Sequence, residues 1–332
     1  MAAAFSTNLD DGGLVAAARG GHERAFVELT SPHRAALHAH SYRLLGSLHD
    51  ADDALQETLL RAWRGIDRFE PRAPVSAWLY RIATNVCLRM LEQRSRRQAA
   101  VDAHLEPYPD WILEQAASPL AGPEASAETR EAIGLAFVAA MQLLPPKQRA
   151  VLVLRDVLDW SAREVAELFE DSVAAVNSAL QRARERLARE QEEGSLARAH
   201  LPVDSGTEAA VMRRFQDAWE AVDIDGIVAL LAADALMTMP PESVSVAGAA
   251  AIGSFFATVP MEGRLDRIRL LPARANGQPA LAAYAEDEIT GSHGAYGVMV
   301  FAIDVDAIVG ITGFPRRPEL FERLGLPVEL TG

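Results

Sequence analysis

The sequence has few of the features that would assign it to a secreted or membrane class. It holds one cysteine, Cys87, so no internal disulfide can form and a cysteine-based metal site is excluded. No apolar run approaches the roughly 20 residues that cross a bilayer, and residues 1–10 lack the basic and apolar parts of a secretory signal. We therefore expect a cytoplasmic protein with no membrane partner, no metal and no cofactor.

Positive charge is also scarce, because 32 lysines and arginines face 46 acidic residues and the net charge is −14. Such a balance argues against a nucleic-acid partner, since polyanions are bound chiefly by basic side chains. The acidity is uneven, however: residues 191–332 hold 10 basic and 20 acidic side chains, whereas arginines cluster within residues 89–97 and 182–189. Because local fields steer DNA, the sequence still permits DNA binding by its first two thirds.

The length of 332 residues, with 49% hydrophobic and 23% charged residues, predicts a soluble chain of two or three domains. Helical spacing of apolar residues, interrupted by proline-rich or small polar segments, divides it. The predicted parts are a helical domain (10–98), an acidic linker (99–130), a second helical domain (131–190), a linker (191–207) and a C-terminal domain (208–332).

The spacing of apolar residues changes in the C-terminal part. After a helical pattern around Trp219, short alternating segments predict strands at residues 265–271, 281–289, 297–303 and 307–312. Helices are predicted at residues 249–257 and 318–324. This mixture indicates an α+β domain.

Residues 160–189 carry the sharpest local pattern. Two helical stretches, residues 162–169 and 173–187, flank a short turn in which Ser172 is placed to cap the second helix. A helix-turn-helix of this kind can place its second helix in a DNA major groove. Side chains on the exposed face that can donate to base edges or phosphates are Asn177, Ser178, Gln181, Arg182 and Arg184. By spacing alone, a surface hairpin with solvated arginines fits equally well.

Three ordered motifs make the pattern specific. They are Leu-Leu-Pro-Pro-Lys-Gln-Arg-Ala-Val (143–151) before the helix-turn-helix, Asp-Ala-Asp-Asp-Ala-Leu-Gln-Glu-Thr (50–58), and Trp-Leu-Tyr-Arg-Ile-Ala-Thr-Asn (78–85). Together they resemble the extracytoplasmic-function sigma factors of bacterial RNA polymerase. The resemblance implies promoter-specific transcription initiation, with core RNA polymerase and promoter DNA as partners. One departure is the turn, where Glu170 and Asp171 replace the usual glycine and apolar residue.

The resemblance assigns a polymerase-binding role to an acidic and amide face of one helix. Its residues are Asp52, Asp53, Gln56 and Glu57. Such a face suits a basic coiled coil on another protein, which in the family belongs to the largest polymerase subunit. Without the resemblance, an ordinary solvated acidic face explains these residues as well.

A promoter-opening role falls on the next helix, where unpaired bases must be held out of the stack. The residues suited to base contact are Trp78, Tyr80 and Asn85, and those suited to nearby phosphates are Arg94, Arg96 and Arg97. Trp78 fits a core position equally well. These residues would read the −10 element, and the helix-turn-helix would read the −35 element.

Residues 208–332 resemble the SnoaL-like branch of the nuclear-transport-factor fold, in which helices wrap a curved sheet into a cone. The resemblance rests on a first helix with Trp219, on Val246-Ala247-Gly248 and on Phe314-Pro315. The predicted fold class is therefore multidomain, with two all-α domains, the second containing the helix-turn-helix, and an α+β cone. Apolar residues that would line a cavity, or else fill a core, are Trp219, Met239, Phe255 and Tyr284.

Enzymes of this fold use a carboxylate or histidine in the cavity. The residues of those types are Asp217, Glu286, Asp287 and His293, but no motif singles out a pair, so we expect no catalysis. We expect the acidic domain to regulate the helical domains, by docking on them or by responding to an unidentified small molecule. Two alternatives stay open: a stand-alone DNA-binding regulator, and a small-molecule-binding or enzymatic SnoaL-like protein with a DNA-binding targeting module.

Overall fold

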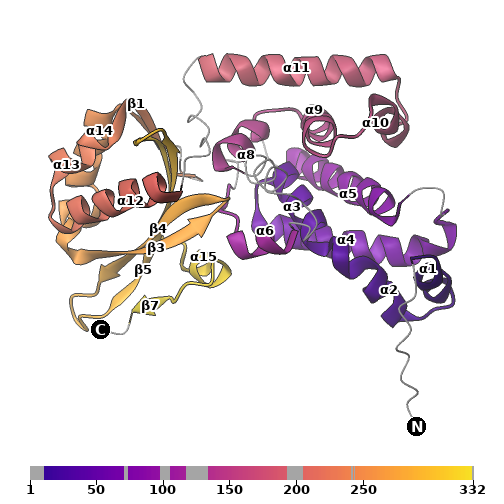
Figure 1. Ribbon diagram of the computed structural model, residues 1–332, viewed down its shortest axis with the longest axis horizontal. Helices are drawn as coiled ribbons and strands as arrows, with labels where there is room; N and C mark the ends of the chain where they lie inside the picture. The colour runs from indigo at the N-terminus through magenta and orange to yellow at the C-terminus, as the bar shows by residue number, and fades with distance from the viewer. Residues whose placement is uncertain are drawn as a thin grey trace, which may run out of the picture.

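The computed structural model describes residues 11–70, 74–97, 105–116, 134–192, 205–240, 242 and 244–330. Two helical modules lie side by side, and a curved sheet with its own helices lies against them (Figure 1). Within these residues, no helix is long and apolar enough to span a membrane.

The N-terminal module is all-helical, as predicted. Its helices are α1 (Asp11–Arg19), α2 (Glu23–Thr30), α3 (Arg34–Leu45), α4 (Leu48–Gly65) and α5 (Val75–Arg97). Gly46 ends α3 at φ 75°, a conformation that glycine adopts without steric cost, and Ser47 then caps α4 by accepting from the Asp50 N–H. The α3–α4 corner is thus set locally.

The second helical module contains the helix-turn-helix. Its elements are α8 (Leu135–Gln142), α9 (Pro146–Leu152), a π-helical turn (Val153–Val157), α10 (Ala162–Phe169) and α11 (Val173–Glu192). It shares one apolar cluster with the N-terminal module, in which Leu44 and Val86 meet Leu144 and Val165. Cys87 belongs to the same cluster, and burial raises the pKa of its thiol to about 12, so it serves as a small apolar side chain, as predicted.

The segment Leu105–Ala116, which the sequence places inside a linker, is ordered. It has no regular secondary structure from residue 105 to residue 108, pairs Pro109 with Ala275 in an isolated β-bridge, and then forms α6 (Asp110–Ala116). It lies between the N-terminal helices and the C-terminal sheet (Figure 1), with Leu105, Tyr108 and Leu113 buried. We call it the strap.

The C-terminal domain is the predicted α+β cone. Its helices are α12 (Ser205–Glu220), α13 (Ile224–Ala229), α14 (Ala249–Thr258) and α15 (Pro318–Arg323). Its strands are β1 (Leu231–Thr238), β2 (Ser245–Ala247), β3 (Ile268–Ala275), β4 (Gln278–Glu286), β5 (His293–Asp304), β6 (Ala307–Pro315) and β7 (Glu329–Leu330). The sheet order is β2-β1-β6-β5-β4-β3, with β7 on β5, and among these described strands only β1 and β6 pair in parallel.

The predicted strands correspond to β3–β6 and the predicted helices to α14 and α15, whereas β1, β2 and β7 were not predicted. Side chains alternate across the sheet, so Leu281 and Ala283 of β4 face the inside of the cone, while Ala282 and Tyr284 face outward. The outer face packs against the rest of the protein through one buried cluster, which includes Tyr42, Tyr108, Val138, Tyr284 and Phe314.

The turn between β3 and β4 is buried in this junction. Asn276 (φ 59°) and Gly277 (φ 71°) form a two-residue hairpin turn of the kind that Asn-Gly favours, yet Asn276 is 0% exposed. Asn276 exchanges two hydrogen bonds with Tyr108 of the strap and donates from its side chain to the Tyr42 hydroxyl. Gln278, just after the turn, accepts from the backbone N–H of Leu135 in α8. This hairpin therefore contacts both helical modules and the strap.

Candidate functional site

Helix α4 presents its acidic and amide residues on the surface. Asp53 and Gln56 are exposed, and Glu57 is half-buried and accepts from Arg61 at 2.6 Å. His49 lies 3.7 Å from Asp53 across one helical turn. These side chains can therefore meet a partner from solvent.

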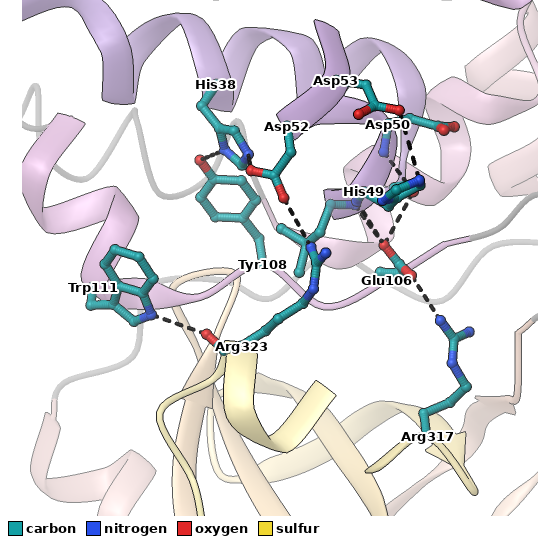
Figure 2. Close-up of polar contacts among 12 residues, drawn as sticks. His38, His49, Asp50, Asp52, Asp53, Glu106, Tyr108, Trp111, Arg317 and Arg323 are labelled. Atoms are coloured by element: carbon teal, nitrogen blue, oxygen red, sulfur yellow. Dashed lines mark hydrogen bonds and ion pairs between the residues drawn. The ribbon is translucent and has the colours of Figure 1, made fainter. Parts of the chain in front are cut away.

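Asp52, on the same face, is already engaged. One oxygen accepts from His38 at 3.1 Å, and the other accepts from Arg323 of α15 at 3.2 Å (Figure 2). Burial lowers the pKa of His38 despite Asp52, so the ring is neutral near pH 7. A neutral ring that donates from Nε2 to Asp52 accepts a hydrogen bond from the Tyr108 hydroxyl at Nδ1, at 2.8 Å. The C-terminal domain thus reaches one residue of the proposed polymerase-binding face.

The three proposed base-contacting residues of α5 lie in different surroundings. Asn85 is exposed, whereas Trp78 and Tyr80 are half-buried against the module core. Trp78 stacks at a tilt on Phe69 with 4.9 Å between ring centroids, and Tyr80 meets the edge of His40 at 5.1 Å. Trp78 and Tyr80 therefore contribute to packing in this form, and Asn85 is the member that faces solvent.

The arginines at the end of α5 are described only in part. Arg94 is half-buried and donates to Asp50 at 3.2 Å. Arg96 and Arg97 close the helix, but their side chains lie outside the described residues. Arg94 would have to leave Asp50 in order to neutralise a phosphate.

The helix-turn-helix is held by local caps. Ser161 and Glu164 form a capping box on α10, and Ser172 accepts from the Ala175 N–H at 3.1 Å, which confirms its predicted capping position. Glu170 takes the left-handed C-cap conformation at φ 51°, and Asp171 accepts from Lys147 at 2.7 Å. The unusual Glu-Asp pair thus keeps the turn in the glycine-like geometry, at a cost in strain.

Replacing Glu170 by glycine is expected to raise the free energy of unfolding by about 1 kcal/mol, because glycine adopts this conformation without a Cβ penalty. Thermal unfolding of the full chain measures the change. Glu185→Gly in the exposed middle of α11 is the control and should lower stability by about 1 kcal/mol. A loss of stability in both variants would show that strain at Glu170 is not what glycine relieves.

All five proposed −35 residues on α11 are exposed: Asn177, Ser178, Gln181, Arg182 and Arg184. Two have partners within the module, since Gln181 donates to Glu185 at 2.8 Å and Arg184 makes two hydrogen bonds to Asp156. DNA phosphates would compete with Asp156 for Arg184. The remaining three can meet base edges without first breaking a described contact.

The cone holds a small apolar cavity of about 80 Å³. Trp219, Met239 and Phe255 line it, whereas Tyr284 points to the opposite face, where its ring packs on Phe321 and its hydroxyl donates to the Pro327 carbonyl. Including Tyr284 in the lining was therefore wrong, because the alternation along β4 turns it outward.

None of the acid or base residues considered for catalysis lines this cavity. Asp217 and Asp287 are exposed, Glu286 pairs with Arg267 at 3.2 Å, and His293 lies at the β5–β7 pairing. The described lining carries no carboxylate or imidazole, and the Trp219 indole N–H is already bonded to the Ile268 carbonyl. The described walls of the cavity are therefore apolar.

Sequence reasoning missed the residues that join the domains. The residues whose side chains cross between parts of the chain are Glu106 of the strap, Asn276 of the hairpin, and Arg317 and Arg323 at the two ends of α15. The Asn-Gly dipeptide between two alternating segments was a readable hairpin signal. No local signal, however, marked that turn as buried.

Comparison with known proteins agrees with this arrangement of modules. The family model described as Sigma-70 region 2 matches residues 29–97, and the model described as Sigma-70, region 4 matches residues 134–187. The first range covers α3–α5 and the second covers α8–α11 up to residue 187. These two modules define the chain as a sigma factor, the class of protein that brings RNA polymerase to promoters.

Similar proteins show to which group of sigma factors the chain belongs. The ECF RNA polymerase sigma factor SigG of Mycobacterium tuberculosis is 39% identical over 92% of this chain and 85% of its own length. SigM of the same species is 36% identical over 54% of this chain. The crystal structure of M. tuberculosis SigJ shares the fold across 91% of this chain and 99% of its own, with a TM-score of 0.63 and 23% identity. The chain belongs to the extracytoplasmic-function sigma factors.

Membership in this family settles the function at the level of class. The protein binds core RNA polymerase and directs promoter-specific transcription initiation; it is not an enzyme. The C-terminal cone lies outside the residues that the two sigma-70 family models match.

Proposed function

We propose that the C-terminal domain holds this sigma factor in a closed form, from which polymerase and promoter must release it. The observation that carries the proposal is the Arg323–Asp52 ion pair, through which the domain contacts a residue of the proposed polymerase-binding face of α4 (Figure 2). In this proposal Asp52, Asp53, Gln56 and Glu57 bind polymerase once the pair opens. The protein acts in the cytoplasm, with the polymerase and chromosome.

The packing of the two sigma modules supports a closed form. They share an apolar cluster, Arg149 of α9 donates to the Leu44 carbonyl at the end of α3, and Glu167 of α10 lies 3.6 Å from Arg81 of α5. The −10 and −35 elements lie at separate places on the DNA. To read both at once, the two sigma modules must move apart. In the open form, Asn85 with Tyr80 and Trp78 would hold −10 bases, Arg94, Arg96 and Arg97 would meet nearby phosphates, and the α11 residues would read the −35 element.

The Arg323–Asp52 pair offers a direct test. Arg323→Glu replaces attraction by repulsion, and we expect transcription from a cognate promoter to rise about fivefold, because exposed ion pairs contribute up to about 1 kcal/mol. The measurement is in vitro transcription with purified core polymerase at subsaturating sigma factor.

The matched control is Arg316→Glu, an equal charge change at an exposed arginine seven positions before Arg323. It should leave transcription unchanged. Equal activation by both substitutions would indicate a general charge effect, and no activation by Arg323→Glu would contradict the restraint. A chain ending at Ser205 tests the same idea more severely, since removal of the whole domain should activate at least as much.

The cavity suggests a way in which the closed form is regulated. We propose that an uncharged, apolar small molecule binds in the cone, because the described lining offers apolar walls and methionines that can adapt to an occupant. A panel of neutral hydrophobic compounds, scored by thermal stabilisation of the full chain, tests it. Stabilisation that is abolished by Ala283→Leu, which fills the cone, would support the site; stabilisation that persists would place the compound elsewhere.

A further inference from the structure

The N-terminus of α4 is capped by a residue from another part of the chain. The first N–H groups of a helix have no partner within it and must find one elsewhere. In α4, Ser47 supplies its hydroxyl to the Asp50 N–H, while the Leu48 and His49 N–H groups donate to one carboxylate oxygen of Glu106, at 2.6 and 3.4 Å. Leu48 and Glu106 are 58 positions apart.

Glu106 is held in this position by the end of α3 and by the corner that leads into α4. Its backbone N–H donates to the Gly46 carbonyl at 3.0 Å, its carbonyl accepts from the Tyr42 hydroxyl at 2.6 Å, and the Ser47 hydroxyl donates to the same carboxylate oxygen that caps α4. The residue is almost fully buried. A buried carboxylate at a helix N-terminus is stabilised both by hydrogen bonds and by the helix dipole.

The second oxygen of the same carboxylate belongs to the C-terminal domain. Arg317 donates to it at 2.8 Å (Figure 2). Arg317 also donates to Glu319. One carboxylate therefore serves the polymerase-binding helix with one oxygen and the docked domain with the other. When the domain leaves, its guanidinium leaves with it, and the full negative charge of Glu106 remains at the helix N-terminus.

We propose that Glu106 is a positioning residue for polymerase binding, which orders the first turn of α4 and so places Asp52 and Asp53. While the domain is docked, the Arg317 guanidinium partly neutralises the carboxylate of Glu106 and so weakens its interaction with the N-terminus of α4. This inference rests on the proposed function for the meaning of the docked state, but the capping role does not depend on it. The strap therefore does more than connect the two sigma modules, because its Glu106 caps the helix that carries the proposed polymerase-binding face.

Two possible roles for Glu106 predict opposite changes in polymerase affinity when Glu106 is replaced by glutamine. If Glu106 merely docks the C-terminal domain through Arg317, Glu106→Gln and Arg317→Ala both loosen docking and both raise polymerase affinity. If Glu106 positions α4, Glu106→Gln weakens the charged cap and lowers affinity for core polymerase about fivefold, a typical effect of cap loss. Arg317→Ala then keeps the cap and raises affinity or leaves it unchanged.

The experiment measures core-polymerase affinity and amide hydrogen exchange for the full chain and its Glu106→Gln, Arg317→Ala and double variants. We expect Leu48 and His49 amides to exchange about fivefold faster in Glu106→Gln, and the double variant to stay below wild-type affinity. Glu319→Gln is the control, because it removes the other partner of Arg317 without touching α4, and it should leave those amides unchanged.

The outcomes are distinct. Higher affinity in Glu106→Gln, or unchanged exchange at Leu48 and His49, overturns the positioning role. If Arg323→Glu fails to activate transcription while Glu106→Gln still speeds exchange and lowers affinity, the restraint is wrong and the cap stands.

Discussion

Asn276→Gly should raise transcription from a cognate promoter about tenfold, because 1.4 kcal/mol corresponds to a factor of ten and this substitution removes two buried hydrogen bonds that hold the closed form. Glycine keeps the left-handed turn but deletes the side-chain amide. The Tyr108 N–H then loses its acceptor, and the Tyr42 hydroxyl loses its donor. A buried polar group without a partner costs about 1–3 kcal/mol, which weakens docking but leaves the fold of the hairpin intact.

The experiment combines in vitro transcription with small-angle scattering of the free protein, whose radius of gyration should increase. Val305→Gly is the matched control, since Val305 also has a positive φ (57°) in a hairpin turn of the same domain but is 72% exposed. It should stabilise the chain by about 1 kcal/mol without changing transcription. A larger radius with unchanged transcription would mean that the closed form does not limit activity.

Asn85→Ala should lower promoter opening by about tenfold or more, since a good side-chain contact to a base edge contributes about 1–3 kcal/mol. Asn85 is exposed on α5, so its removal leaves no cavity and should leave both stability and core-polymerase affinity unchanged. Permanganate reactivity of unpaired thymines in the −10 region measures the opening.

Gln93→Ala serves as the comparison, because it removes another exposed amide from the same helix. It should open promoters normally. An equal defect in both variants, or normal opening by Asn85→Ala, would remove Asn85 from the base-reading role.

The sequence predicted best what local rules control. The helix-turn-helix and the capping position of Ser172 follow from spacing and side-chain chemistry within a few residues. Strand β1 was missed because Leu231–Thr238 is rich in alanine, leucine and methionine and poor in β-branched residues. Its strand conformation comes from pairing with β2 and β6, which a local window cannot contain.

The candidate site was predictable only as separate surfaces. The acidic face of α4 was assigned from resemblance and the polar face of α11 from the helix-turn-helix pattern, but the contact of Asp52 with Arg323 joins residues 271 positions apart. Tyr284 was misplaced because its face depends on the register of β4, which a one-residue shift reverses. Long-range pairing, not composition, decides which of these surfaces is covered.

The buried β3–β4 hairpin gives the chain a cooperative character. Its docking site exists only while α3, the strap and the start of α8 are in place together, because Tyr42, Tyr108 and Leu135 each supply part of it. Loss of any one of these partners therefore weakens the contacts that the other two make with the hairpin. If the C-terminal domain restrains the sigma modules as proposed, its release should therefore be concerted, and the chain should pass between a closed and an open population rather than vary its activity by degrees.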